Sequence, residues 1–138
     1  AATDMFNIVR TRDDNKCALI SDVSNIEKIV YYEHNFSAVN SLILTKELKK
    51  VLKEKIPMIS KTFSDLVNHD FDFLNIDLEG HDYKVLKNID LKKYRPKLIC
   101  IEILVNSVDK EKIFSYMENN NFKLIKICKV SYFFENTN

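Results

Sequence analysis

Glycine is almost absent from this sequence, because its 138 residues include a single one, Gly80. Loops that bind the phosphates of a nucleotide usually need several glycines, since their backbone must approach the phosphate closely or take a positive φ. The sequence therefore contains no glycine-rich nucleotide loop. Its length fits one domain with a hydrophobic core, and residues 1–138 are predicted to form a single domain.

Three further features are missing, and each argues against a class of protein. The net charge is only +1, so no broad basic surface predicts nucleic acid as a partner. No apolar run is long enough to cross a bilayer and no signal-peptide pattern opens the sequence, so no membrane partner is expected. No CxxC pair occurs; Cys17, Cys100 and Cys128 lie among apolar residues, which predicts reduced, buried thiols and a cytoplasmic location.

The first half of the sequence predicts two strands and two helices. "NKCALISD" and "SNIEKIVYYE" are expected to be strands that fold back as a hairpin, with the turn at residues 22–25. "TKELKKVLKEK" predicts a helix that is capped by Thr45 and that ends before Pro57. "KTFSDLVNH" predicts a short helix capped by Thr62, with Asp65 in a variant of the capping box.

The second half alternates strands and helices. "FDFLNIDL" and "PKLICIEIL" predict strands, and a helix over about residues 82–88 connects them. "DKEKIFSYMENN" predicts an amphipathic helix capped by Asp109, and "FKLIKICKV" and "SYFFEN" predict two final strands. The short link between these strands requires an antiparallel pair. The expected fold class is α/β, with a mostly parallel sheet and an antiparallel hairpin at its C-terminal end.

One stretch, "FDFLNIDLEGHDYKVL", is more polar than a buried parallel strand should be. Alternation along the strand points Asn75, Asp77 and Glu79 to one face. Burying carboxylates without partners is costly, so this row needs a reason. Ligands of open α/β sheets bind beyond the carboxyl ends of the strands, where His81 follows and where Glu102 of the next strand can converge.

A purely structural explanation of these residues stays open. Asp77 can accept backbone N–H bonds at the start of the next helix, and Glu79 can favour the positive end of that helix. His81 can be an ordinary surface histidine. The pattern alone gives a functional crevice and a structural role about equal weight.

The segment "DFLNIDLEGHDYKVLKNIDLKKYRPKLICIEI" resembles the C-terminal signature of the FkbM family of S-adenosylmethionine-dependent methyltransferases. The positions that fit the family pattern are Asp72, Asp77, Glu79, Gly80, His81, Val85, Leu86, Pro96 and Glu102. Asn75 stands where the family usually has lysine, and Asp82 where it usually has glutamate. Upstream, "ALISD" and "IVYYE…SAVNSL" also resemble the family, so the similarity runs from about Asn15 to Glu102.

The resemblance implies a Rossmann-like class I methyltransferase fold, a seven-stranded sheet with an antiparallel last strand, and S-adenosylmethionine as cofactor. It assigns catalysis to Asp77, Glu79 and His81, cofactor binding to Ser21, Asp22 and Asn75, and the substrate to Glu102. The expected reaction is O-methylation of a small-molecule or glycan hydroxyl, with His81, Asp77 or Glu79 as the base. No residue is assigned to a metal.

The family's first two strands, which carry the glycine-rich cofactor loop and a ribose-binding acid, have no counterpart here. "AATDMFNIVRTRDD" is similar to the end of the helix that follows them, so the chain is expected to be the C-terminal portion of a longer enzyme. On that expectation the chain alone binds S-adenosylmethionine poorly or not at all. Strands left without neighbours would favour a homodimer or a swapped assembly.

Two other functions fit the acidic row. Asp77, Glu79 and Glu102, with His81, could bind a divalent metal in a hydrolase, although any pair of acids on one strand face meets that criterion. The domain could instead be non-catalytic and use its fold only for contacts with other proteins.

Overall fold

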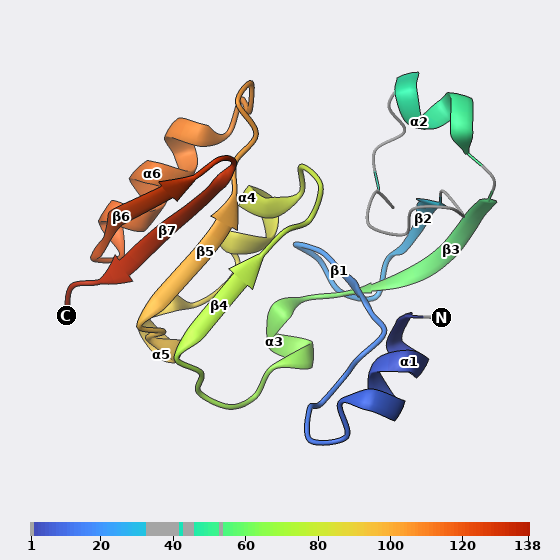
Figure 1. Cartoon of the computed structure of the whole chain (residues 1–138), viewed down its shortest axis with the longest axis horizontal. Helices are drawn as coiled ribbons and strands as arrows, with labels where there is room; N and C mark the ends of the chain where they lie inside the picture. Colours follow the sequence, from blue (N-terminus) through green and yellow to red (C-terminus); the bar gives the residue numbers. More distant parts are fainter. Residues whose placement is uncertain (1, 33–41, 43–45, 53) are drawn as a thin grey trace.

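The structure is a computed structural model that describes residues 2–32, 42, 46–52 and 54–138. Its strands form two sheets, one of four strands and one of three. In Figure 1 the four-stranded sheet lies on the left and the three-stranded sheet on the right. The chain is therefore of the expected mixed α/β class, but its described strands do not form one continuous sheet.

The four-stranded sheet contains β4 (Phe73–Ile76), β5 (Leu98–Glu102), β6 (Phe122–Cys128) and β7 (Ser131–Asn136), in the order β4-β5-β7-β6. β4 and β5 are parallel, whereas β7 is antiparallel to both β5 and β6. Consequently β4, β5 and β6 run in the same direction and only the last strand opposes them. The sequence predictions of these strands and of the antiparallel C-terminal pair are confirmed.

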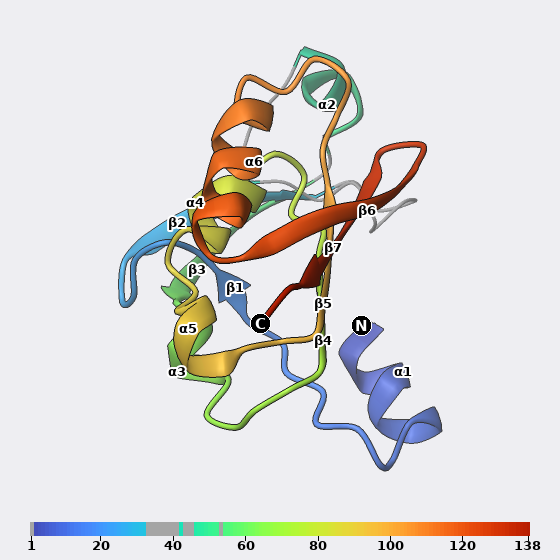
Figure 2. The ribbon, with the colours of Figure 1, turned by 90° about the vertical axis from the view of Figure 1, so that its left-hand side faces the viewer.

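Helices cover one face of this sheet: α4 (Asp82–Leu86), α5 (Leu91–Tyr94) and α6 (Lys110–Asn119) all lie on the same side of it in Figure 2. Side chains at helical spacing on α4 and α6 pack against alternate residues of β4, β5 and β7. The most deeply buried of them are Val85, Leu86, Ile99, Ile101, Ile113, Met117 and Phe134. This packing is the hydrophobic core of the molecule.

No described helix covers the opposite face of the four-stranded sheet. Phe73 on β4 is 51% exposed, and Asn75, two residues further along the same face, is also exposed. Cys100 lies opposite Asn75 in the neighbouring strand and is buried. The face that carries the polar row of β4 is therefore the open one.

The three-stranded sheet contains β1 (Leu19–Ile20), β2 (Glu27–Tyr32) and β3 (Glu54–Lys61), in the order β1-β3-β2. The predicted hairpin between the first two strands is wrong, because β3 lies between them, parallel to β1 and antiparallel to β2. The loop between β1 and β2 turns at Asn25, whose φ is 59°, and its backbone bonds to Ser60 of β3. A pairing with a strand more than thirty residues away leaves no local signal in the sequence of this loop.

β3 itself was not predicted. The helix expected over residues 45–55 ends earlier, since α2 covers Lys46–Val51 and β3 begins at Glu54; its predicted cap, Thr45, lies outside the described residues. Pro57 therefore sits inside a strand, opposite Ile29 of β2. β1 pairs only with Ser60 and Lys61, so the strand has a neighbour on one side only at Pro57, which is where sheets tolerate proline.

Helix α3 (Phe63–Leu66) confirms the predicted capping box. The carboxylate of Asp65 accepts hydrogen bonds from the backbone N–H of Thr62 at 2.7 Å and from its hydroxyl at 2.8 Å. The Ser24 hydroxyl, in the loop after β1, contacts the same carboxylate. The predicted cap of α6 is less complete, because Asp109 stands at the N-cap position but its carboxylate binds Lys112 at 2.7 Å and accepts no cap hydrogen bond.

The prediction of three buried cysteines is wrong for two of them. Cys100 is buried, but Cys17 and Cys128 are exposed, and all three are free thiols. Cys128 ends β6, a strand at the edge of the four-stranded sheet, so apolar neighbours in sequence do not enclose it. None of the helices described by the structure is long and apolar enough to span a membrane.

Candidate active site

The turn after β4 carries most of the predicted site, and its backbone has an unusual conformation. Glu79 has φ 49° and Gly80 has φ 90°, so two successive residues lie in the left-handed region. A side chain at a positive φ is disfavoured, and glycine takes that conformation without a clash. The only glycine of the sequence therefore stands where the chain turns sharply from β4 into α4.

Asp82 holds this turn in place. Its side chain is 6% exposed, and its two carboxylate oxygens accept hydrogen bonds from the backbone N–H of Leu78 at 2.8 Å and of Gly80 at 3.0 Å. The role that sequence reasoning considered for Asp77, accepting backbone N–H bonds at the start of the helix, belongs to Asp82 instead. The signal was an aspartate at the first position of the helix.

The charges of Asp77 and Asp82 lie close enough to Glu79 and Glu102 to affect the ionisation of these two glutamates. Burial raises the pKa of Glu79, and the negative charges of Asp77 and Asp82 raise it further. Burial also raises the pKa of Glu102, followed by the charges of Asp77, Glu79 and Asp82 and a hydrogen bond with Asp77. The ends of β4 and β5 thus form a region of concentrated negative charge.

His81 lies near Asp22 and two lysines, Lys28 and Lys84. Burial lowers its pKa most, and the positive charges of Lys84 and Lys28 lower it further, against an opposing effect of Asp22. Its Nδ1 atom is buried and has no hydrogen-bond partner in the described part of the chain. The imidazole is therefore neutral at neutral pH and keeps one ring nitrogen free to bind a ligand.

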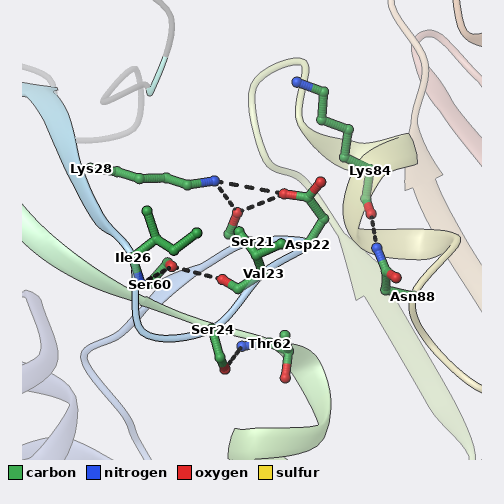
Figure 3. Close-up of polar contacts among 10 residues, drawn as sticks. All are labelled: Ser21, Asp22, Val23, Ser24, Ile26, Lys28, Ser60, Thr62, Lys84 and Asn88. Carbon is green, nitrogen blue, oxygen red and sulfur yellow. Dashed lines mark hydrogen bonds and ion pairs between the residues drawn. The ribbon is translucent and has the colours of Figure 1, made fainter.

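Ser21 and Asp22, predicted to bind the cofactor, follow directly after β1 (Figure 3). The buried Ser21 hydroxyl donates to Asp22 Oδ1 at 2.9 Å. Lys28 of β2 contacts the same hydroxyl, and its Nζ lies 3.6 Å from Asp22 Oδ1. Burial alone would raise the pKa of Asp22, but the hydrogen bond from Ser21 and the positive charges of Lys28 and Lys84 together lower it. Lys28, which sequence reasoning missed, therefore contributes to the lowered pKa of Asp22.

Asp22 connects the two halves of the site. Its carboxylate interacts electrostatically with His81, which precedes α4, and with Lys84 on α4. Figure 3 shows Asp22 between Lys28 and the helix that carries Lys84. The fold thus brings the end of β1 next to the turn after β4, although about sixty residues separate them in the sequence. Asn75, two residues before Asp77, lies on the open face of the sheet rather than in the turn.

A cavity of about 280 Å³ opens between the ends of β4 and β5 and the start of α6. Gly80 and Asp82 of the turn line it, together with Glu102 at the end of β5. The loop after β5 supplies the rest of its outer wall, including Leu104 and Val108. Sequence reasoning identified Glu102 but not this loop, whose exposed apolar residues are the signal that could have marked it.

Within the described residues, no group of three histidine, cysteine, aspartate or glutamate side chains is arranged to hold a metal ion. Asp77, Glu79 and Glu102 are near enough to repel one another, but with His81 they do not form a coordination sphere. The geometry gives no support to the metal-dependent hydrolase that the sequence left open.

Comparison with known proteins gives one match. A family model described as the methyltransferase FkbM domain matches residues 7–124, which is most of the chain and includes every residue of the site described above. No curated protein and no solved structure shows a significant match to the chain.

Proposed function

The chain belongs to the FkbM methyltransferase family, and from that premise we propose that it takes part in transfer of a methyl group from S-adenosylmethionine to a hydroxyl of a small molecule or glycan. The observation that supports this most is the approach of Asp22 to His81, because it joins the residues proposed for the cofactor to those proposed for catalysis. A Rossmann-like fold is part of the same proposal. It requires parallel strands followed by an antiparallel last strand, and β7 is antiparallel to β4, β5 and β6.

The residues present suit S-adenosylmethionine in charge and in donor chemistry. The cofactor carries a positive sulfonium, and the mutually repelling carboxylates of Asp77 and Glu79 would be relieved by a nearby cation. Asp22, whose pKa is lowered by the hydrogen bond from Ser21 and by the charges of Lys28 and Lys84, offers an acceptor for hydroxyl or amino donors of the adenosyl group. The Nδ1 of His81, which has no hydrogen-bond partner among the described residues, is a further atom that a ligand would satisfy. We assign Asp22 to the cofactor on this basis, and Ser21 and Asn75 because the resemblance to the family implies them.

When bound, S-adenosylmethionine supplies a methyl group whose bond to sulfur breaks as a bond to the acceptor oxygen forms, leaving a neutral thioether. The acceptor hydroxyl loses its proton, so the chain must provide a base. His81 suits this role because its lowered pKa leaves the ring neutral and able to accept a proton at neutral pH. Asp77 and Glu79 would orient the acceptor or share in the proton transfer, and Glu102, on the cavity wall, would hold the acceptor.

Other properties follow as part of the proposal. Free thiols at Cys17, Cys100 and Cys128 suit a cytoplasmic setting, where cysteines stay reduced. The near-neutral charge of the chain gives no reason to invoke nucleic acid. A homodimer is the partner that the exposed apolar surface suits best, and it is taken up in the Discussion.

The proposal is tested by measuring binding and transfer in the natural full-length protein. Asp22→Asn should weaken S-adenosylmethionine binding about tenfold or more in calorimetry, since hydrogen bonds to charged groups contribute about 1.5–3 kcal/mol. His81→Ala should leave binding of the cofactor nearly unchanged but slow methyl transfer by about a hundredfold or more. The matched control is Asp72→Asn, because Asp72 is highly exposed and pairs only with Lys97 in the structure.

Two results would contradict the proposal. If the unmodified full-length protein does not bind S-adenosylmethionine, the assignment of this cofactor is wrong. If the His81 variant and the unmodified protein transfer methyl groups at equal rates, the assignment of His81 as the base is wrong. The assignment of S-adenosylmethionine as cofactor is then unaffected.

A further inference from the structure

The loop after β5 exposes large apolar side chains at the mouth of the cavity. Leu104 is 47% exposed, Val105 84% and Val108 87%. Three aliphatic residues exposed within five positions are unusual for a surface loop, where polar residues usually dominate. We call Leu104, Val105 and Val108 the apolar lip. Leu104 and Val108 line the cavity directly, and Val105 is an exposed residue of the same loop.

The loop holds the lip in a defined conformation. The backbone N–H of Ser107 donates to the carbonyl of Leu104 at 2.9 Å, which closes a turn around Val105. The Ser107 hydroxyl accepts a hydrogen bond from the backbone N–H of Asp109 at 3.3 Å, at the start of α6. These bonds fix the loop between β5 and α6, so the exposure of the lip is a property of the fold.

Acidic residues line part of the cavity, and Lys112, which binds Asp109 at 2.7 Å, lies at its edge. The described residues that line it include Asp82, Glu102 and Asp109 but no lysine, arginine or histidine. Asp82 is occupied by two backbone N–H groups, and Asp109 is bound to Lys112. Glu102 shares a hydrogen bond with Asp77, but its other oxygen can accept a hydrogen bond from a ligand hydroxyl, and an acceptor bearing phosphate or carboxylate at this position would be repelled.

The cavity is also small for a complete ligand. Its volume of about 280 Å³ is at the lower end of the range for small-molecule sites. A sugar ring or a group of similar size would fill it, and any longer substituent would have to leave through the mouth. The surface it would meet there is the apolar lip.

We propose that the acceptor is an uncharged amphiphile, a sugar or other polyol that carries an alkyl or acyl chain, with its hydroxyl at Glu102 and its chain on the apolar lip. This inference rests on the proposed function, because it treats the cavity as the acceptor site. It adds that the apolar part of the acceptor contributes affinity and that an anionic acceptor, such as a nucleotide sugar, is excluded.

The test uses n-octyl glucoside below its micelle concentration, with methyl glucoside as the matched polar probe. Methyl resonances of Leu104, Val105 and Val108 are followed by NMR during each titration, without cofactor. Octyl glucoside should shift them and bind at least about tenfold more tightly than methyl glucoside, because several methylenes leave water. Glu102→Gln should weaken both probes by a similar factor, since it acts on the shared head group.

Variants of the lip complete the test. The double variant Leu104→Ser, Val108→Ser should lose the preference for the octyl chain. The control is Ile125→Ser, Ile127→Ser on the edge strand β6, where both residues are 51% exposed; it should keep the preference. Equal affinity for the two probes, or loss of the preference in the control pair, would overturn the proposal.

Other occupants of the lip have distinct signatures. Shifts of the lip resonances with protein concentration alone would show that a second copy covers it, and shifts only on addition of lipid vesicles would show a membrane contact; either result replaces the proposal. Because binding is measured without cofactor, its result does not depend on methyl transfer. The proposed function and the proposed acceptor can therefore fail separately. Octyl glucoside binding at the lip without methyl transfer in the full-length protein would refute the proposed function, whereas transfer to acceptors that bind elsewhere would refute the inference.

Discussion

At the scale of single residues, the site depends on side chains held in conformations or charge states that they would not adopt alone. Glu79 occupies the left-handed region beside Gly80, and its carboxylate faces other negative charges. A residue strained in both backbone and charge, directly before Gly80 of the cavity wall, is typical of functional sites, where strain is retained for a purpose.

Replacing Glu79 measures that strain. Glu79→Gly should raise the free energy of unfolding by up to about 1 kcal/mol, because glycine takes φ 49° without the left-handed penalty, partly offset by its larger entropy loss. Glu79→Gln separates the contribution of charge, since it keeps the backbone conformation. Urea denaturation gives both values. A loss of stability in the glycine variant would show that the side chain makes a contact worth more than the strain.

Lys28 and Asp22 give a prediction that depends on pH. Lys28→Met should raise the pKa of Asp22 measured by NMR, whereas Lys28→Arg should keep it low. Because the folded-state pKa of Asp22 lies below its usual value, its stabilising effect is present above the unfolded pKa of 3.8 and is lost as pH falls through the folded value. The methionine variant should therefore lose stability at neutral pH but less in acid. An unchanged pKa in this variant would mean that the hydrogen bond from Ser21, without the charge of Lys28, lowers the pKa of Asp22.

At the scale of elements, the turn between β4 and α4 positions most of the site, and Asp82 is its main support. Asp82→Ala leaves two backbone N–H groups in a part-buried environment without acceptors, which should cost about 2–4 kcal/mol in urea denaturation. Asp90 is a matched control, because it also accepts two backbone N–H bonds, from Lys92 and Lys93 at the start of α5, but is exposed. Asp90→Ala should cost about 0.5–2 kcal/mol. Equal losses would show that burial does not decide the importance of Asp82.

The elements that sequence reasoning identified are those with strong local signals. The capping box at Thr62 and Asp65, the helical spacing of Ile113 and Met117 and the short link between β6 and β7 are each readable within a dozen residues. β3 was missed because lysines and glutamate before Pro57 read as a helix with a terminator. Its strand conformation comes from pairing with β1 and β2, and that pairing outweighs local propensity.

At the scale of the whole molecule, two apolar surfaces have no partner within the described chain. Helix α1 (Ala2–Val9) exposes Met5, Phe6, Ile8 and Val9, each by 47–70%. The face of the four-stranded sheet opposite its helices exposes Phe73 on β4, which is also an edge strand. Exposed apolar surfaces and open strand edges both favour association with another chain.

The chain on its own is therefore expected to self-associate. Light scattering should show a dimer that forms as concentration rises, and the variant Phe6→Ser, Ile8→Ser should shift the equilibrium toward monomer by removing apolar surface from α1. Val23→Ser is a control of similar chemistry outside α1, since Val23 is 38% exposed in the loop after β1. A monomer at high concentration would count against the prediction.

The sequence by itself determined the α/β class, the strands of the second half with helices α4 and α6 but not α5, the family, and the acidic row at the end of β4. These depend on alternation, helical spacing and a motif, all of which are local. Only the tertiary structure decided that Lys28 pairs with Asp22, that β3 separates β1 from β2, and that the loop after β5 forms one wall of the cavity. The physical reason is that these contacts join residues that are not neighbours along the chain, and charge or hydrophobicity at one position does not reveal which distant group will meet it.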